Sequence, residues 1–303
     1  MRVLSIDGGG IRGIIPALVL SEVERRTGRR VAELCDLVAG TSTGGILACA
    51  LTRPGAAPAE ELVELYRTEG PKIFKRSLAQ RVRSADGLID ARHDDGALDD
   101  ALTRYLGSGR LSDATTKVLV TAYDLHAREP YFFKSWRDDR DGPLRIVARA
   151  TAAAPTYFEP VFAGRRSLID GGVFATNPAM CAYAEAVVLG GAPPRFVLSL
   201  GTGRQMRPIP HDQAKDWGLV EWVRPLIDVV FDGVSDTVEY QLAHLMPPES
   251  VVRLQPELDR ASDALDDASK RNLGLLEEQA RELIASSDAA IDAACAALLA
   301  DDS

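Results

Sequence analysis

Residues 2–13 read Arg-Val-Leu-Ser-Ile-Asp-Gly-Gly-Gly-Ile-Arg-Gly, a short apolar run that leads directly into a run of glycines. The apolar run predicts a buried strand over 2–6, and the periodicity after the glycines predicts a helix over 14–26. The same order recurs downstream, where a predicted strand over 34–38 meets a second glycine cluster and a predicted helix over 46–51. Two consecutive strand–glycine turn–helix units favour a parallel sheet with helices on both faces.

The second glycine cluster, Gly-Thr-Ser-Thr-Gly over residues 40–44, matches the GxSxG pattern of a nucleophile elbow. Small residues on either side of Ser42 let the backbone turn sharply, so that the hydroxyl projects above the edge of the sheet. The start of a helix also favours negative charge that develops nearby. The alternative is a glycine-rich turn with a structural serine. Because an apolar strand precedes the pattern and an apolar helix follows it, we expect Ser42 to be a nucleophile.

The first glycine cluster allows two functions. Consecutive glycines after a strand expose backbone N–H groups, which an oxyanion hole requires, and Arg12 adds a cation that could hold the loop or stabilise developing charge. The spacing Gly8-x-Gly10-x-x-Gly13 also matches a dinucleotide-binding fingerprint. That fingerprint requires an acidic residue about 20 positions further on, at the end of the next strand, where this sequence has the serine pattern instead. We therefore expect an oxyanion hole and no bound cofactor.

A third glycine-flanked site follows a predicted strand over 167–169, where Asp170 precedes Gly171 and Gly172. Taken alone, an aspartate in this position is an ordinary turn residue. A nucleophilic serine, however, needs a base within hydrogen-bond reach. The histidines lie in polar, loop-like or helical surroundings that predict surface positions: His93, His126, His211 and His244. A direct pair of Ser42 and Asp170 is therefore the simplest catalytic arrangement.

The composition narrows the class of protein. The chain has 303 residues, of which 46% are hydrophobic and 26% charged, values ordinary for a globular protein. Its formal net charge of −9 argues against a nucleic-acid partner and against electrostatic docking on anionic lipid. The four cysteines lie far apart without a CxxC pair, so we expect free thiols and no metal site. Neither a signal peptide nor a membrane-spanning run is readable, which predicts a cytoplasmic protein.

Strands and helices continue to alternate up to about residue 205. Further strands are predicted over 117–123, 131–134, 196–200 and 251–254. Further helices are predicted over 60–67, 97–106, 144–153 and 178–189. With no repeat and no linker, we expect one domain over 1–303, with a core over about 1–205 and a helical C-terminal part over about 215–303.

Residues 217–246 form an apolar-rich stretch that allows two interpretations. Helical apolar stripes usually pack against a core, which favours one or two core helices. Alternatively, part of the stretch forms a lid or a membrane-contacting surface beside the active site. Trp217, Trp222 and Tyr240 suit that second role, because their amphipathic rings are stable at an apolar–polar boundary.

Three motifs together resemble the patatin-like phospholipase family, in the family's order: Asp-Gly-Gly-Gly-Ile-Arg-Gly over 7–13, Gly-Thr-Ser-Thr-Gly-Gly over 40–45 and Asp-Gly-Gly over 170–172. The resemblance implies an α/β protein with a three-layer α/β/α fold, a mostly parallel central sheet and a helical C-terminal region. It implies that Ser42 is the nucleophile and Asp170 the proton acceptor. The residues that match the oxyanion-hole loop are Gly8, Gly9, Gly10, Arg12 and Gly13. The elbow and turn glycines are Gly40, Gly44, Gly171 and Gly172.

The resemblance implies hydrolysis of ester bonds in lipids or phospholipids, without a metal or cofactor. Residues 86–95 and the tail after Lys215 are similar to bacterial members, some of which act as antiphage effectors switched on by cyclic nucleotides. A nucleotide-gated phospholipase is therefore one alternative, and a non-catalytic binding or storage protein on the same fold is another. Peripheral membrane contact and an oligomer are compatible with the sequence, and we expect no nucleic-acid polymer as a partner.

Overall fold

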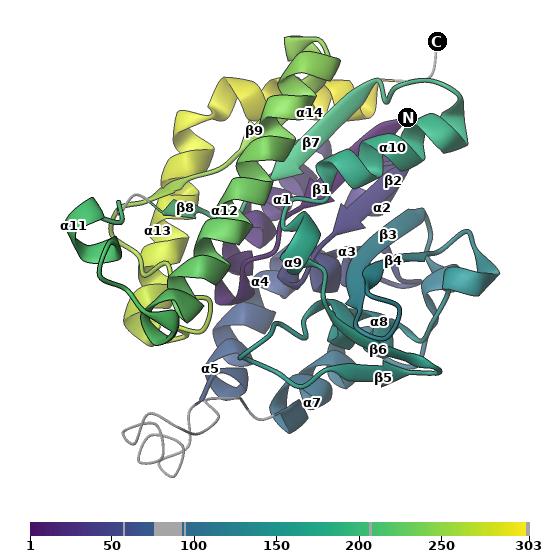
Figure 1. The fold of residues 1–303 in the computed structure, drawn as a ribbon. Helices are drawn as coiled ribbons and strands as arrows, with labels where there is room; N and C mark the ends of the chain where they lie inside the picture. Colours follow the sequence, from purple (N-terminus) through teal and green to yellow (C-terminus); the bar gives the residue numbers. More distant parts are fainter. Residues whose placement is uncertain (57, 76–92, 94, 206–207, 301–303) are drawn as a thin grey trace.

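A computed structural model describes residues 1–56, 58–75, 93, 95–205 and 208–300 of the chain. Its central sheet has eight strands in the order β5-β6-β3-β2-β1-β7-β9, with β4 paired to β3 (Figure 1). The strands are β1 (Arg2–Ile6), β2 (Leu37–Gly40), β3 (Lys117–Asp124), β4 (Glu129–Lys134), β5 (Val161–Ala163), β6 (Arg166–Asp170), β7 (Phe196–Leu200) and β9 (Val251–Leu254). A separate two-stranded sheet joins β8 (Arg204–Gln205) to β10 (Glu257–Leu258).

The strands that precede the first two glycine clusters lie at the centre of the sheet. β1 pairs in parallel with β2 on one side and with β7 on the other. The parallel pairing extends outward to β3 and β9, whereas β4, β5 and β6 form antiparallel pairs on the β3 side. The prediction of a mostly parallel sheet is therefore confirmed, with an antiparallel extension that no sequence pattern revealed.

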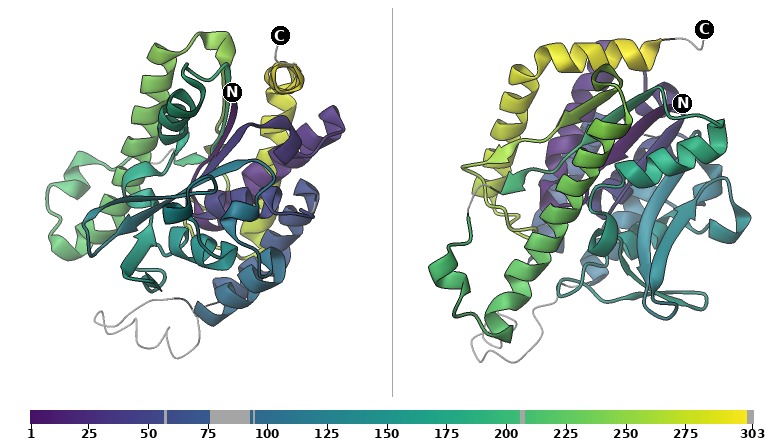
Figure 2. Two further views of the ribbon diagram at one scale, coloured as in Figure 1. Left: turned by 90° about the vertical axis from the view of Figure 1, so that its right-hand side faces the viewer. Right: turned by 45° about the horizontal axis from the view of Figure 1, so that its top comes forward.

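Helices cover both faces of the sheet, as the edge-on view in Figure 2 shows. Val3 of β1 is buried against one helical layer and its neighbour Leu4 against the other, because successive residues of a strand point to opposite faces. One layer contains α10 (Ala179–Gly190) and α12 (Leu219–Leu245), and the other contains α1 (Ile14–Thr27) and α3 (Thr43–Thr52). The predicted three-layer α/β/α fold is confirmed.

The C-terminal part is helical, as predicted, apart from the short strands β9 and β10. Helices α13 (Lys270–Ser286) and α14 (Asp288–Leu299) pack against α1, and their buried apolar residues belong to the same hydrophobic cluster as Leu4. One domain over 1–303 stays a prediction, which this shared core favours. Among the described residues, the remaining α-helices are α2 (Val31–Leu34), α4 (Ala59–Thr68), α5 (Gly70–Ile73), α7 (Asp95–Leu106), α8 (Leu144–Thr151), α9 (Gly172–Ala175) and α11 (His211–Ala214).

The strand predicted over 34–38 is displaced in the structure. Residues Val31–Leu34 form the short helix α2, and β2 begins only at Leu37. The Asp36 carboxylate accepts a hydrogen bond from the Arg2 amide (2.6 Å) and forms an ion pair with the Arg2 side chain (2.9 Å). Because Asp36 is held beside the start of β1 in this way, the second strand starts after it.

Two kinds of feature are absent from the described residues. Within them, no helix is both long and apolar enough to cross a membrane. Nor do those residues include a group of three or more His, Cys, Asp or Glu side chains that could hold a metal ion. The predicted connection that includes Asp86, Gly87 and Leu88 lies outside the described residues.

Candidate active site

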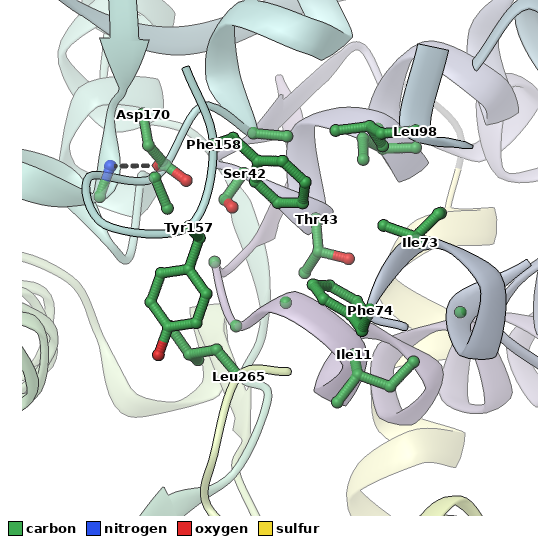
Figure 3. A pocket seen from close by; sticks show the side chains of 18 of the residues that line it. Ile11, Ser42, Thr43, Ile73, Phe74, Leu98, Tyr157, Phe158, Asp170 and Leu265 are labelled. Atoms are coloured by element: carbon green, nitrogen blue, oxygen red, sulfur yellow. Dashed lines mark hydrogen bonds between the residues drawn. The ribbon is translucent and has the colours of Figure 1, made fainter. Parts of the chain in front are cut away.

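Ser42 lies at the turn between β2 and α3 and is the N-terminal cap residue of that helix. Its backbone has φ 54° and ψ −123°, a conformation that residues other than glycine rarely adopt. Hydrogen bonds on both sides hold the turn: the Ser42 amide donates to Thr151 Oγ1 (2.8 Å), and the Gly44 amide donates to the Thr41 carbonyl (2.8 Å). This is the geometry of a nucleophile elbow, and Figure 3 shows its serine in a pocket.

The elbow leaves no room for side chains at its two flanking glycines. A Cβ at Gly40 would lie 2.2 Å from the Gly44 carbonyl oxygen, and a Cβ at Gly44 would lie 2.1 Å from the Ile6 carbonyl oxygen. Both obstacles are backbone atoms, which cannot rotate away as a flexible side chain can. The small residues of the pattern are therefore a steric requirement of this turn.

We expect Gly44→Ala to lower the free energy of unfolding by about 3 kcal/mol or more, because the added methyl group would force α3 away from β1. Gly274→Ala is the matched control: Gly274 is also a helical glycine, but a Cβ there would meet nothing within 4 Å. That change should instead stabilise the protein by about 1 kcal/mol, since alanine is the better helix former. Urea unfolding followed by circular dichroism measures both values, and equal effects would contradict the steric argument.

The glycine loop after β1 faces the elbow. A Cβ at Gly8 would lie 3.3 Å from the Ser42 Cβ, and Gly8, Gly9 and Gly10 all line the pocket that contains Ser42. The Gly8 amide donates to the Thr176 carbonyl (2.9 Å) and is therefore occupied. Among the described residues, the amides of Gly9 and Gly10 have no hydrogen-bond acceptor. These two N–H groups are thus available to an oxyanion.

Two further residues predicted for this loop, Arg12 and Gly13, do not line the pocket. The buried Arg12 side chain donates to the carbonyl oxygens of Gly9 (3.3 Å) and Gly203 (3.4 Å). The sequence allowed Arg12 either to hold the loop or to stabilise developing charge, and this geometry matches the first role. A Cβ at Gly13 would lie 2.2 Å from Thr43 Oγ1, so glycine at this position lets the loop pack against α3.

Asp170 reaches the elbow through the antiparallel strand β6. One edge of β3 pairs with β4, and the first half of the other edge pairs with β2 as far as Val120. β6 takes the rest of that second edge, where Asp170 lies opposite Ala122. The end of β6 therefore meets the end of β2 along the same edge of β3. This topology places Asp170 beside Ser42, as Figure 3 shows.

The Asp170 carboxylate is buried, and its Oδ1 accepts a hydrogen bond from the Gly172 amide (2.7 Å). Burial raises the pKa of Asp170 to about 7, although the nearby Ser42 hydroxyl and the Gly172 amide lower it. The turn is tight, because a Cβ at Gly171 would lie 2.1 Å from Thr121 Oγ1. A carboxylate in this environment can exchange a proton with a serine near neutral pH.

A second buried carboxylate, Asp7, lies where the glycine loop begins. It forms an ion pair with Arg253 of β9 (2.6 Å), and burial raises the pKa of Asp7 to about 6 although the arginine lowers it. Arg253 also pairs with Glu239 of α12 (2.8 Å). Because Asp7 does not line the pocket, it anchors the loop and is not placed to act as a base. The sequence could not reveal this anchor, which joins residues 246 positions apart.

The prediction of surface histidines is wrong for one of the four. His93 is buried, with its Nε2 3.1 Å from Asp266 Oδ2 and its ring stacked on Tyr157 at a centroid distance of 6.1 Å. Neither His93 nor Asp266 lines the pocket of Ser42. The aromatic residues around it come from distant segments, so the local sequence carried no signal of its burial. The others are exposed as predicted: His126, His211 and His244.

The pocket beside Ser42 is almost entirely apolar. It has about 740 Å³ of empty space, its open mouth included. Ser42 and Asp170 lie at one side of it, and aliphatic and aromatic side chains form most of the rest (Figure 3). Burial of a hydrocarbon chain against such walls is favourable. The apolar lining residues include Ile11, Ile46, Leu65, Ile73, Phe74, Leu98, Phe158, Phe231 and Leu265.

The fold and the site together define a class of protein: three-layer α/β/α proteins with a serine at a strand–helix elbow that faces a glycine loop. The family model of patatin-like phospholipases matches residues 4–183. The chain belongs to this family. Patatin-like protein 2 of Arabidopsis thaliana is 31% identical over 94% of this chain and 83% of its own length. A protein of Solanum tuberosum named probable inactive patatin-3-Kuras 1 is also 31% identical, over 94% and 86%.

Among solved structures the likeness is remote. VipD from Legionella pneumophila matches 94% of this chain with a TM-score of 0.42 and 12% identity. The type III effector protein ExoU matches 99% of the chain with the same TM-score and identity. This chain spans 66% of VipD and 53% of ExoU. At such a TM-score the likeness supports no conclusion about the site.

Proposed function

We propose that this chain is a serine lipid acyl hydrolase with Ser42 as nucleophile and Asp170 as base. The observation that carries the proposal is the placement of Ser42 beside the buried Asp170 carboxylate at one side of an apolar pocket. Membership of the patatin-like phospholipase family supports the reaction type. The relative named as probably inactive shows why the activity itself must be measured.

In the proposed mechanism, Ser42 Oγ attacks the ester carbonyl carbon while its proton passes to Asp170. The developing oxyanion is bound by the amides of Gly9 and Gly10, each worth roughly 3–4 kcal/mol in other serine hydrolases. The N-terminus of α3 adds a favourable dipole. When the tetrahedral intermediate collapses, the bond to the leaving oxygen breaks and Asp170 returns the proton to that oxygen. Water then attacks the acyl-enzyme by the same route, and the fatty acid leaves.

The apolar pocket suits the acyl chain of the substrate. A hydrocarbon chain gains roughly 0.8 kcal/mol for each CH₂ group that it buries, and most of the side chains that line the pocket besides Ser42 and Asp170 are aliphatic or aromatic. We therefore propose phospholipids or lysophospholipids as substrates, with the acyl chain in the pocket and the headgroup at its mouth. Regulation by a cyclic nucleotide stays a prediction.

The proposal is tested by assaying the purified protein on p-nitrophenyl esters of increasing chain length and on a panel of phospholipids and lysophospholipids. We expect hydrolysis that improves with chain length, and labelling of one serine by a fluorophosphonate probe. The same assays with added cyclic nucleotides test gating, which requires activity only in their presence. If no ester is hydrolysed under either condition, the result would favour the alternative of a non-catalytic binding or storage protein.

The pH dependence of this activity should follow the ionisation of Asp170. Because the base must be deprotonated to accept the serine proton, kcat/KM on a soluble ester should rise with pH through about 7 and level off above it. A histidine base would titrate in the same range, so His93→Gln is the control and should leave the profile unchanged. A flat profile between about pH 5 and 9 would contradict Asp170 as the base.

A further inference from the structure

The two halves of α12 have different surroundings. In its C-terminal half, Val238 and Leu242 are buried in the hydrophobic cluster on the sheet. In its N-terminal half, four large apolar side chains are between 37% and 50% exposed: Trp222, Leu226, Val229 and Val230. The core interpretation of residues 217–246 is therefore correct for the second half of the helix. The exposed residues of the first half need another explanation.

These exposed side chains form a stripe on the side of α12 that faces away from the core. Trp222, Leu226 and Val229 follow the spacing i, i+4, i+7, which places them on one side of a helix. At about 100° per residue, the buried Val238 and Leu242 lie roughly half a turn away from that side. A helix that is apolar on opposite sides buries only one of them against the sheet, so its outer stripe is left for a partner outside the described fold.

The stripe lies at the end of the molecule that carries the active site. Phe231, which directly follows Val230 on the same helix, lines the pocket of Ser42. Figures 1 and 2 show the N-terminal half of α12 running past α9 towards the end of the molecule that carries α5, whose Ile73 also lines the pocket. Trp217, just before the helix, packs edge-on against Trp222 with ring centroids 5.0 Å apart.

Two more exposed apolar side chains lie at the carboxyl end of the parallel strands, which is the end that carries the glycine loop and Ser42. Leu125 follows the carboxyl end of β3, which runs parallel to the strands that lead into the glycine loop and into Ser42. Phe162 in β5, 76% exposed, pairs with Ser167 of β6 beside that end of β3. We call these two residues and the four exposed apolar residues of α12 the apolar rim.

The charge beside the α12 part of the rim indicates which kind of surface that part can meet. Residues 208–232 contain five acidic and two basic residues. Anionic lipid attracts clusters of lysine and arginine, and this segment has the opposite sign. Apolar side chains with tryptophan at their border are, by contrast, typical of protein segments that insert into the interface of a bilayer. Zwitterionic phospholipid fits both observations.

We propose that the apolar rim inserts into the surface of a zwitterionic phospholipid bilayer and holds the mouth of the pocket against it. The inference rests on the proposed lipid acyl hydrolase function, because it supplies the step by which a lipid leaves the bilayer and enters the pocket. On this proposal, the N-terminal half of α12 contacts the membrane, whereas its C-terminal half packs against the sheet.

The test measures vesicle binding and hydrolysis separately. Binding to phosphatidylcholine vesicles is measured by flotation with Ser42→Ala protein, so that the result does not depend on catalysis. Leu226→Asp and Phe162→Asp should each weaken binding about tenfold or more, because a charge would have to enter the apolar layer. Val188→Asp is the matched control: Val188 is 79% exposed but lies near the end of α10, which leads to the amino end of β7. It should leave binding unchanged.

With active protein, Leu226→Asp should lower hydrolysis of vesicle phospholipid to the same extent and keep hydrolysis of a soluble short-chain ester within about twofold. Added salt should change binding to phosphatidylcholine little, because that contact is apolar. Anionic lipid should weaken binding, because the acidic segment beside the rim would then face like charge. Unchanged vesicle binding by both rim variants would overturn the proposal. So would equal loss on vesicles and soluble ester with a lower melting temperature, or a wild-type dimer that Leu226→Asp dissociates while vesicle binding persists. Failure of the hydrolase proposal would show instead as vesicle binding without hydrolysis of any ester.

Discussion

Ser42→Ala is expected to lower ester hydrolysis roughly 10⁴-fold or more, because it removes the only nucleophilic oxygen in the proposed mechanism. Labelling by a fluorophosphonate probe should disappear in parallel, since Ser42 is the one serine among the described residues that line the pocket. Residual turnover would come from the oxyanion amides and substrate binding alone. Mass spectrometry of the labelled wild-type protein identifies the modified residue. Labelling of another serine would refute the assignment.

The same position offers a control for folding. Alanine cannot relieve the positive φ of Ser42, so Ser42→Ala should leave the melting temperature close to that of the wild type. Glycine adopts such a conformation without strain, so Ser42→Gly should stabilise the protein by about 1 kcal/mol while being equally inactive. Two inactive variants with different stabilities would separate the chemistry of the hydroxyl from the strain of the turn. Destabilisation by both would mean that the hydroxyl is structural.

The parts of the site that the sequence predicted well are those with a local cause. The position of Ser42 follows from an apolar strand, flanking small residues and an apolar helix, all within residues 37–52. The need for glycine at Gly40 and Gly44 is equally local, because the turn brings their Cα atoms against nearby backbone. Such signals can be read from one sequence because the atoms that interact are close together along the chain.

The parts that the sequence could not predict depend on contacts between distant segments. The sequence predicted the pair of Ser42 and Asp170 from the need for a base, but not the antiparallel pairing of β6 with the far end of β3 that brings them together, because neither strand carries a sign of that partner. The burial of His93 requires aromatic residues around Tyr157, and the direction of Arg12 depends on Gly203. Helical periodicity in α12 was ambiguous for a related reason: both sides of the helix are apolar, and only packing against the sheet selects one of them.

Asp170→Asn is expected to lower kcat on a soluble ester roughly 10³–10⁴-fold, since an amide cannot accept the serine proton. The amide keeps the shape of the carboxylate and can still accept the hydrogen bond from the Gly172 amide, so the turn should survive. The comparison is with His93→Gln. His93 is buried, and the base of a catalytic triad is usually a histidine. If His93→Gln cost more activity than Asp170→Asn, the Ser–Asp pair would be wrong and a triad should be sought.

The same variant should be more stable than the wild type, and the gain should depend on pH. In the folded wild type the pKa of Asp170 is about 7 against an ordinary value of 3.8, so between these values the folded state binds the proton more tightly than the unfolded state. Wild-type stability therefore falls as pH rises through this range. Asparagine does not ionise, so the stability of Asp170→Asn should not fall with pH for this reason. The gain should be absent below about pH 4 and complete above about pH 7, and it is bounded at about 4 kcal/mol.

Chemical unfolding of both proteins at pH 4, 6 and 8 measures this difference directly. An advantage for Asp170→Asn that grows with pH would mean that burial of the carboxylate costs stability, as expected for a group that the proposed mechanism requires in its ionised form. An advantage that is constant with pH would instead reflect packing or hydrogen bonding, and would contradict the raised pKa. The activity loss and the stability gain must then come from the same carboxylate, because burial makes Asp170 both a strong base and a costly charge.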